Sequence, residues 1–341
     1  MAQVLLVTHP AYLEHVPGRR HPERPARLQA VLAGLAAAGL DDALVPTTPR
    51  PATRAELERV HPAHYLDWLR ELCLAGGGVL DIDTRAGPAS WDAAVLAAGA
   101  GPSAVERLAA GEGDAAFLAV RPPGHHASAD LPKGFCLLNN VAVTAASLAA
   151  AGERVLIVDF DAHHGDGTQD TFYDDGRVAY VSMHQYGTRS GVPFYPGTGR
   201  VEETGHGAGA GLTVNFPFPP HTTGDAYLEA LDDVVVPLAE AFGPTWVLAS
   251  AGFDAHAADP RTDLGLSSGD FAAITSRVME LAPKGKRLAF LEGGYDLDAL
   301  ALSAAACVGA MAGVAVAAEP STSGGPGRRV VAAARAARAP S

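Results

Sequence analysis

The chain has 341 residues, 48% of them hydrophobic and 18% charged, and its formal net charge is −13. This composition is typical of a soluble globular protein with a large core, and the acidic balance argues against direct binding of nucleic acid, because phosphate neutralisation requires a surface rich in lysine and arginine. The three cysteines are far apart, which indicates a reducing, cytoplasmic location and excludes a zinc site built from cysteine, and no apolar run is long enough to span a membrane.

Along the chain, short apolar runs alternate with longer segments that repeat apolar residues at helical spacing. The first run, Val4–Val7, is too short for a signal segment and predicts a strand. Further strands are predicted at residues 116–120, 155–158, 178–182, 212–216, 246–249 and 287–291. Helices are predicted at residues 28–38, 60–72, 91–110, 140–151, 227–242 and 271–281. Strands that alternate with such helices indicate βαβ units, and therefore one α/β domain over residues 1–316 with a mainly parallel central sheet.

Two other segments are predicted to lack regular structure, and two histidines are predicted to lie outside any site. The loop over residues 18–27 contains too much proline and charge for an element, and Arg27 at its end either belongs to a plain connection or points towards a site. His61 and His64 have no carboxylate nearby in the sequence and are interpreted as capping or surface histidines. Residues 317–341 are rich in Ser, Gly, Pro, Ala and Arg, which predicts a disordered tail with weak helicity.

Four of the predicted strands are each followed at once by an unusual polar cluster. These clusters are Arg121-Pro-Pro-Gly-His-His126, Asp159-Phe-Asp-Ala-His-His-Gly-Asp166, Ser250-Ala-Gly-Phe-Asp-Ala-His256 and Glu292-Gly-Gly-Tyr295. Because ligands of open α/β sheets bind at the carboxyl ends of the strands, we expect the four clusters to converge there. Each alone is a weak signal, since a His-His pair can be structural and Gly-Gly-Tyr can be a turn. Together they predict a functional site.

The second cluster indicates a metal site. Residues two apart on a strand share a face, so we expect Asp161 and His163 to point at one spot just past the strand. A carboxylate and an imidazole are ligands that zinc accepts. A lone Asp-x-Asp is more often a capped turn, but two further histidines, a third aspartate and a Gly-Asp-Gly turn in the same stretch favour the metal.

In this order, the four clusters resemble those of the arginase-fold metal-dependent deacylases, the histone deacetylase and acetylpolyamine amidohydrolase superfamily. The resemblance extends from His21-Pro-Glu-Arg-Pro-Ala-Arg27 to Tyr295 and includes Gly134-Phe-Cys-Leu-Leu-Asn-Asn140, Ser182-Met-His-Gln185 and Phe194-Tyr-Pro-Gly-Thr-Gly199. Pro-Pro-Gly-His-His with Gly-Phe-Cys is most similar to the class II-type bacterial branch. The resemblance implies a single-domain, three-layer αβα arginase/deacetylase fold.

The same resemblance implies a role for individual residues. It implies a zinc ion held by Asp161, His163 and Asp254, and three protein ligands leave the open position typical of a catalytic site. It also implies paired imidazoles, with His125 matched to Asp159 and His126 matched to Asp166, and a tyrosine, Tyr295, that donates its hydroxyl to the substrate carbonyl.

The resemblance further implies a narrow substrate channel and bound potassium. Phe135 and Tyr195 match the two aromatic walls of the channel, next to Gly134. Potassium would be held by oxygens of one group comprising Asp159, Asp161, His163, Ser182 and Met183, and of a second comprising Phe172, Asp175 and Val178.

The implied reaction is hydrolysis of an amide. Zinc would polarise the carbonyl and lower the pKa of a water molecule, with His126 as general base and then acid and His125 as an electrostatic partner. Tyr295 and zinc would stabilise the oxyanion. The products would be acetate, or another short acid, and a free amine. The sequence leaves open whether the substrate is acetyllysine, an acetylpolyamine or a small acylated metabolite, and it is compatible with a homo-oligomer.

Two alternative functions are less well supported by the residues. A binuclear manganese ureohydrolase of the same fold would need another carboxylate two residues after Asp254, where the sequence has His256, and would leave the Pro-Pro-Gly-His-His and Gly-Gly-Tyr clusters unexplained. A non-catalytic acyl-lysine-binding module would be expected to lack a ligand, a histidine or Tyr295, and none of these is missing.

One position departs from the commoner pattern of the resembling family. After the Asp-Pro that follows the third ligand, most class II-like members have leucine at the channel rim and polyamine-selective members have an acidic residue. Without a gap this position is Arg261, although Leu264 or Leu266 could occupy the rim instead. The arginine is either an exposed loop residue paired with Asp259 or Asp263, or it faces the mouth and favours a carboxylate near the acylated amine.

Overall fold

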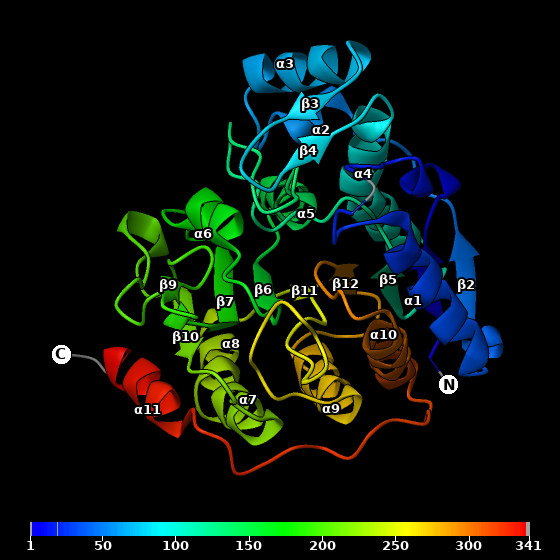
Figure 1. Cartoon of the computed structure of the whole chain (residues 1–341). Helices are drawn as coiled ribbons and strands as arrows, with labels where there is room; N and C mark the ends of the chain where they lie inside the picture. The colour runs from blue at the N-terminus through cyan, green and yellow to red at the C-terminus, as the bar shows by residue number, and fades with distance from the viewer. Residues whose placement is uncertain (1, 19, 339–341) are drawn as a thin grey trace.

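Eight parallel strands form the centre of the computed structural model, which describes residues 2–18 and 20–338 (Figure 1). The strand order is β10-β7-β6-β11-β12-β5-β1-β2. The strands are β1 (Val4–Val7), β2 (Leu44–Thr47), β5 (Ala115–Leu118), β6 (Val155–Asp159), β7 (Val178–Gln185), β10 (Thr213–Phe218), β11 (Trp246–Ala251) and β12 (Arg287–Leu291). The prediction of a parallel sheet is therefore confirmed. The unpredicted strand β2 contains Pro46, which an edge strand tolerates because one side of its backbone has no partner.

Helices cover both faces of the sheet and produce three layers. In Figure 1, α4 and α5 lie on one face, and α1 and α7 to α10 lie on the other. The helices are α1 (Pro25–Ala37), α2 (Arg54–Leu57), α3 (Ala63–Leu74), α4 (Ser90–Ala109), α5 (Asn140–Ala150), α6 (Asp166–Phe172), α7 (Gly224–Ala230), α8 (Val236–Phe242), α9 (Ser268–Met279), α10 (Leu297–Ala312) and α11 (Arg328–Ala337). Strands β6 and β11 are buried along their whole length between these layers, which explains their continuous apolar sequence. The predicted αβα architecture is confirmed.

Short elements complete the description. They are the pairs β3 (Gly78–Val79) with β4 (Arg85–Ala86) and β8 (Thr188–Arg189) with β9 (Val192–Pro193), and the helical turns η1 (Pro10–Leu13), η2 (Asp41–Ala43), η3 (Gly207–Gly209) and η4 (Leu231–Val235). Among the described residues, no helix has both the length and the apolar character that a membrane span requires.

The order of the strands places the four polar clusters side by side. The chain forms β5 and then skips to β6, β7 and β10, and its last two strands, β11 and β12, fill the gap between β6 and β5. Asp159 at the end of β6 therefore lies beside Ser182 of β7 on one side and Ser250 of β11 on the other. Clusters that are far apart in the sequence meet at one edge because β11 and β12, which come late in the chain, occupy the centre of the sheet.

Four helical segments before the C-terminal tail differ from the prediction. The helix expected at residues 227–242 is divided into α7 and α8 by a π-helical turn, η4. The division coincides with Pro237, which lacks the N–H that an uninterrupted α-helix would bond to the carbonyl of Asp233. Three further helices, α2, α6 and α10, were not predicted. Helix α10 is apolar on most sides because α1 and α9 both pack against it.

The C-terminal segment differs from the predicted disordered tail. Residues 317–327 form an extended strap along the helices α7 and α9, and α11 follows it (Figure 1). Glu319 accepts hydrogen bonds from the backbone and hydroxyl of Ser268, both at 3.0 Å, and lies 2.7 Å from Nε2 of His256. Helix α11 buries Val331 and Ala334. These partners lie in other elements, so the composition of the strap could not indicate them. Residues 339–341 lie outside the described residues.

We expect Glu319→Ala to lower the stability of the fold. The substitution removes the acceptor of the Ser268 N–H and hydroxyl and leaves the buried Nε2 of His256 without its partner, which costs about 1–3 kcal/mol when such a group is fully buried. Because the Glu319 side chain is 43% exposed, we expect the lower end of that range, or a decrease in Tm of about 2–4 °C. Calorimetry of this variant and of Glu202→Ala, a substitution of an exposed glutamate, would measure it. Equal Tm values for the two variants would contradict the role of the strap.

Candidate active site

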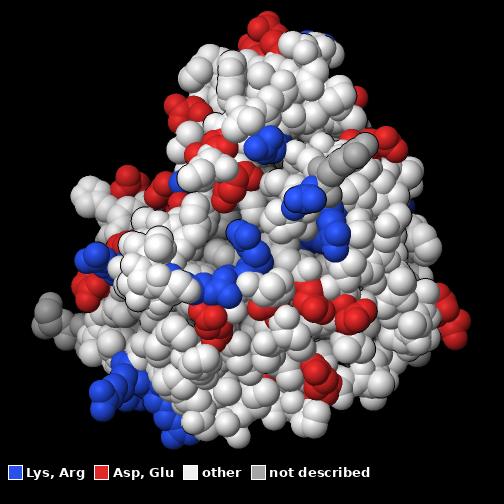
Figure 2. Space-filling model, viewed as in Figure 1, with Lys and Arg blue, Asp and Glu red and all other residues white. Residues whose placement is uncertain are grey.

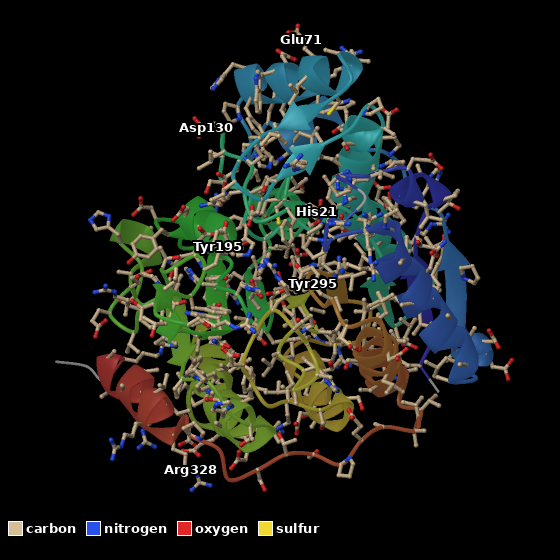
Figure 3. The ribbon with its side chains drawn as sticks, viewed as in Figure 1. His21, Glu71, Asp130, Tyr195, Tyr295 and Arg328 are labelled. Carbon is tan, nitrogen blue, oxygen red and sulfur yellow. The ribbon has the colours of Figure 1, made fainter. Side chains whose placement is uncertain are left out.

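The four polar clusters meet at the carboxyl edge of the sheet, where hydrogen bonds join each of them to another. A hollow of about 660 Å³ opens beside them, and its lining includes His163 of the second cluster together with Phe194, Tyr195 and Arg261. Figure 3 shows Tyr195 and Tyr295 in the middle of this face, over the ends of the central strands. The predicted convergence of the clusters is therefore observed.

The innermost group consists of Asp161, His163 and Asp254, all three of them buried. One potential ligand atom from each lies within 4.8 Å of the others. Nδ1 of His163 is 2.9 Å from a carboxylate oxygen of Asp254 and 3.2 Å from one of Asp161. Two carboxylates and one imidazole nitrogen that face a common point can bind a divalent cation.

The local backbone differs from the expected strand alternation. Strand β6 ends at Asp159, so Asp161 and His163 project from the bend that follows it and do not share a strand face. The bend is held by backbone N–H groups, because Asp159 accepts from the N–H of Asp161 at 3.1 Å and Asp161 accepts from that of His163 at 2.9 Å. Both side chains still reach one point, but hydrogen bonding within the bend directs them there.

Two glycines make room for the paired carboxylates. A β-carbon on Gly252 would lie 2.0 Å from the carboxylate of Asp161, and one on Gly293 would lie 2.4 Å from Asp254 and 2.5 Å from Asp161. The Gly293 N–H donates to Asp161 at 2.7 Å, and the Ala162 N–H donates to Asp254 at 2.9 Å. Backbone donors thus orient the outer oxygens of both carboxylates.

The electrostatics of this group favour a cation. Burial opposes a charge on His163, but the carboxylates of Asp254 and Asp161 outweigh it and raise the pKa of the imidazole to about 9. The same attraction would act on a metal ion held by the three side chains.

Two neighbouring imidazoles, whose planes are tilted by 44°, lie beside the Asp-His-Asp group. The ring centroids of His125 and His126 are 4.0 Å apart. Nδ1 of His125 is 3.0 Å from Asp159, and Nδ1 of His126 is 2.9 Å from Asp166. An aspartate on Nδ1 fixes the tautomer, so that Nε2 of each ring is the nitrogen that remains for chemistry.

The two imidazoles differ in charge. Burial disfavours a charged His125, but Asp159 and Asp161 outweigh it and raise its pKa well above the ordinary value. Burial, reinforced by the positive charge of His125, lowers the pKa of His126 to about 3 although Asp166 opposes the shift. The two shifts run in opposite directions, so the surroundings favour the charged form of His125 and the neutral form of His126.

Aromatic side chains surround the approach to this pair. The ring centroid of Tyr195 is 5.1 Å from that of His126, and the ring centroid of Phe135 is 5.8 Å from that of Tyr295. Gly134 has a φ of 56°, and a β-carbon there would lie 2.4 Å from the His126 ring. Glycine is therefore the only residue type that fits at position 134 without moving the imidazole. Burial raises the pKa of the Tyr295 hydroxyl well above its ordinary value, so the hydroxyl keeps its proton.

The residues implied for potassium lie behind and beside this centre. Ser182 and Met183 belong to β7, next to Asp159, and the Ser182 hydroxyl is 2.8 Å from Nδ1 of His184. Phe172 ends α6, Asp175 follows it, and Val178 begins β7. The carboxylate of Asp175 pairs with Arg177 at 2.6 Å. Potassium at either group stays a prediction.

Comparisons with known proteins identify the family. A model of the histone deacetylase domain matches residues 21–311. The chain is 39% identical to a protein named "Probable deacetylase" from Archaeoglobus fulgidus, over 90% of this chain and 86% of that one. It is 38% identical to the histone deacetylase-like amidohydrolase of Pseudomonas aeruginosa, over 81% of this chain and 73% of that one. The chain belongs to the histone deacetylase family.

A solved structure agrees with this family assignment. The crystal structure of the HDA15 HD domain has a TM-score of 0.89 to this chain at 36% sequence identity, and the match covers 98% of this chain and 96% of that one. The resemblance inferred from the four clusters is thus confirmed at the level of family and fold.

Two residues that support the histone deacetylase site, Glu292 of the fourth cluster and Lys133, had no individual role predicted from the sequence. Glu292 accepts hydrogen bonds from the N–H groups of Gly124 at 2.7 Å and of His125 at 3.2 Å. Lys133 donates to Asp166 at 2.7 Å, which leaves that carboxylate shared between a lysine and His126. Glu292 directly follows β12, and this position placed it in a cluster but did not indicate its partner.

The position of His61 differs from the predicted capping or surface histidine. It is fully buried and not at the surface: Nδ1 lies 2.8 Å from the carbonyl of Ala129, and Nε2 accepts from the N–H of Asn139 at 2.9 Å. It joins α3's N-terminal turn to the loop after the paired histidines. His64, one turn away, is exposed as predicted.

The environment of His256 bears on the manganese alternative. This residue occupies the position where a second metal would need a carboxylate, and its Nε2 faces Glu319 at 2.7 Å. Among the residues that the structure describes, Asp161, His163 and Asp254 are the one group arranged to hold a metal ion. The geometry therefore favours a single metal.

Proposed function

We propose that this chain is a zinc-dependent deacetylase that hydrolyses the amide of an acylated amine such as acetyllysine, an acetylpolyamine or a small acylated metabolite. The observation that carries the proposal is the buried Asp161-His163-Asp254 group beside two imidazoles that are each held by an aspartate. The names of the relatives, a deacetylase and a histone deacetylase-like amidohydrolase, support the same reaction class.

The donor set fits zinc. Asp161, His163 and Asp254 would hold the ion through two carboxylates and Nδ1 of one imidazole, and three protein ligands leave a position for water or substrate. When bound, zinc polarises the amide carbonyl and lowers the pKa of water. We also propose that potassium binds near Ser182 and Met183, where Asp159 at the end of β6 pairs with Ser182 of β7.

The paired imidazoles would move the protons. His126, neutral and held through Nδ1 by Asp166, would accept a proton from the attacking water on Nε2 and later donate one to the departing amine. His125, held by Asp159, would stay charged and stabilise the negative charge that develops beside it. The two roles are assigned from the separate aspartate partners of the rings and from the opposite directions of their pKa shifts.

Tyr295 would stabilise the transition state. Its hydroxyl stays protonated and would donate a hydrogen bond to the carbonyl oxygen as that oxygen becomes an oxyanion. Phe135 and Tyr195 would enclose the thin acylated arm and exclude water from the reacting amide.

Removal and return of the metal tests the proposal. We expect chelator-treated protein to lose acetate release from acetyllysine, acetylspermidine and a small N-acetylated amine, because Asp161, His163 and Asp254 alone do not activate water. One equivalent of zinc per chain should restore release from at least one of the three.

Two results would contradict the proposed function. One is acetate release that persists when no metal can be detected in the protein. The other is restoration by two equivalents of manganese together with urea release from a guanidino compound, which would support the ureohydrolase instead. Arginine is a suitable guanidino probe for this arm.

A further inference from the structure

Arg261 lies over the two aromatic rings at the mouth of the site. Its guanidinium carbon is 5.5 Å from the ring centroid of Phe135 and 5.8 Å from that of Tyr295. Arg261 also lines the hollow that contains His163 and Tyr195. The alternative, an exposed loop arginine paired with Asp259 or Asp263, is not what the structure shows, because the residue is only partly exposed and faces the channel walls.

The backbone of Arg261 is braced on both sides. One oxygen of Asp259 accepts the Arg261 N–H at 2.9 Å, and the other accepts the Tyr295 N–H at 2.6 Å. Arg189 donates to the carbonyl of Arg261 at 2.8 Å and to that of Pro260 at 2.9 Å. One carboxylate thus ties the arginine to the tyrosine of the site, and the side chain is presented from a fixed backbone.

The nearby carboxylates are engaged by other groups. Asp259 accepts only backbone N–H groups, and Asp263 pairs with Arg189 at 3.1 Å. Within the described parts of the chain, no carboxylate oxygen lies within 4.0 Å of the Arg261 guanidinium. A partly buried guanidinium without a counter-ion retains its capacity to bind a carboxylate through two parallel hydrogen bonds.

The surroundings reinforce a preference for negative charge. The lining of the hollow contains two arginines, Arg189 and Arg261, against one acidic residue, Asp263, although the whole chain has a net charge of −13. Figure 2 shows several basic side chains gathered around the hollow in the middle of this face, with acidic side chains beside and beyond them. Such a mouth repels a polycationic arm and attracts an anionic one.

We propose that Arg261 binds a carboxylate of the substrate, so that the site selects acylated amines with a negative group close to the acylated nitrogen. Free or C-terminal acetyllysine has this chemistry, and acetylated polyamines do not. The inference rests on the proposed deacetylase function and names the substrate class of that same site. The other role open to Arg261 is to pack on Phe135 as part of the channel wall, which would not distinguish substrates by charge.

The test compares two substrates that differ by a single charge. Acetyllysine blocked at its α-amine is offered with a free carboxylate and as the carboxamide, and acetylspermidine is the cationic comparison. The readout is the ratio of kcat/KM for carboxylate over carboxamide within each zinc-loaded variant, so a partial loss of folded protein cancels. We expect a ratio of about ten in the wild type, which is the effect of one charge-assisted pair at a partly exposed site.

Four variants separate charge recognition from packing. Arg261→Leu should bring the ratio to about one, and Arg261→Lys should give an intermediate value because the point charge remains but the planar fork is lost. Arg261→Glu should reverse the preference and increase kcat/KM for acetylspermidine relative to the carboxylate. Lys284→Leu is the matched control. It also removes one positive charge, but Lys284 lies before the amino end of β12, whereas the site lies beyond the carboxyl end, so this variant should keep the wild-type ratio.

The outcomes distinguish this inference from the proposed function. Equal kcat/KM values for carboxylate and carboxamide in the wild type, or a preference that survives in Arg261→Leu, would overturn the role of Arg261 and leave the deacetylase function intact. Acetate release from none of the substrates by the zinc-loaded wild type would overturn the proposed function, and the inference with it.

Discussion

Asp254→Ala is expected to abolish stoichiometric zinc binding and to lower acetate release by more than about a hundredfold. Changes to groups that merely orient a metal ligand already cost about 10- to 100-fold in metal affinity or activity, and this change removes a ligand. It also leaves Nδ1 of His163 and the Ala162 N–H without the carboxylate that each contacts. Metal analysis of the purified variant, paired with the acetate assay, measures both effects.

Two further variants make the Asp254 result specific. Asp254→Asn retains an acceptor for the Ala162 N–H but supplies a neutral ligand, so it should fold normally and still bind zinc weakly. Asp130→Ala removes an exposed carboxylate from the edge of the molecule (Figure 3) and should keep full zinc and activity. If Asp254→Ala retained one zinc per chain and wild-type turnover, the ligand set proposed here would be wrong.

Tyr295→Phe is expected to lower kcat by about a hundred- to a thousandfold, the usual effect of removing one oxyanion donor. KM should change little, because the hydroxyl interacts mainly with charge that develops in the transition state. The ring keeps its contacts with Phe135 and with the guanidinium of Arg27, 4.9 Å from its centroid, so the fold and the zinc content should be those of the wild type.

The control for the tyrosine is another hydroxyl remote from the hollow. Tyr173→Phe, at the end of α6, should leave kcat unchanged. Steady-state kinetics with acetyllysine, zinc analysis and Tm measured on both variants separate a catalytic defect from misfolding. An unchanged kcat in Tyr295→Phe would remove this hydroxyl from the mechanism.

The sequence by itself determined the type of fold and the position of the site along the chain. Apolar runs such as Val155–Val158 predict buried parallel strands because both faces of these strands are covered by helices, so burial leaves a local signal. The polar clusters follow those runs directly, and the rule that parallel strands present their carboxyl ends at one edge was sufficient to bring the clusters together. The family resemblance carried by the clusters was confirmed by the comparisons.

Only the tertiary structure decided which groups pair across that edge. Glu292 contacts the backbone of His125, 167 residues away, and no periodicity in either segment indicates this contact. The burial of His61 and the ordered strap at Glu319 also depend on partners in distant elements. A composition rich in small and polar residues predicts disorder when such partners cannot be seen.

The orientation of Arg261 is another feature that the local sequence could not determine. The sequence left two positions open for its side chain, because Asp259 and Asp263 are both close enough along the chain to pair with it. In the structure Asp259 accepts backbone N–H groups and Asp263 pairs with Arg189, so the guanidinium lies over Phe135 and Tyr295. Local sequence determines which charges are present, whereas the folded chain decides which charges neutralise each other and which remain for a ligand.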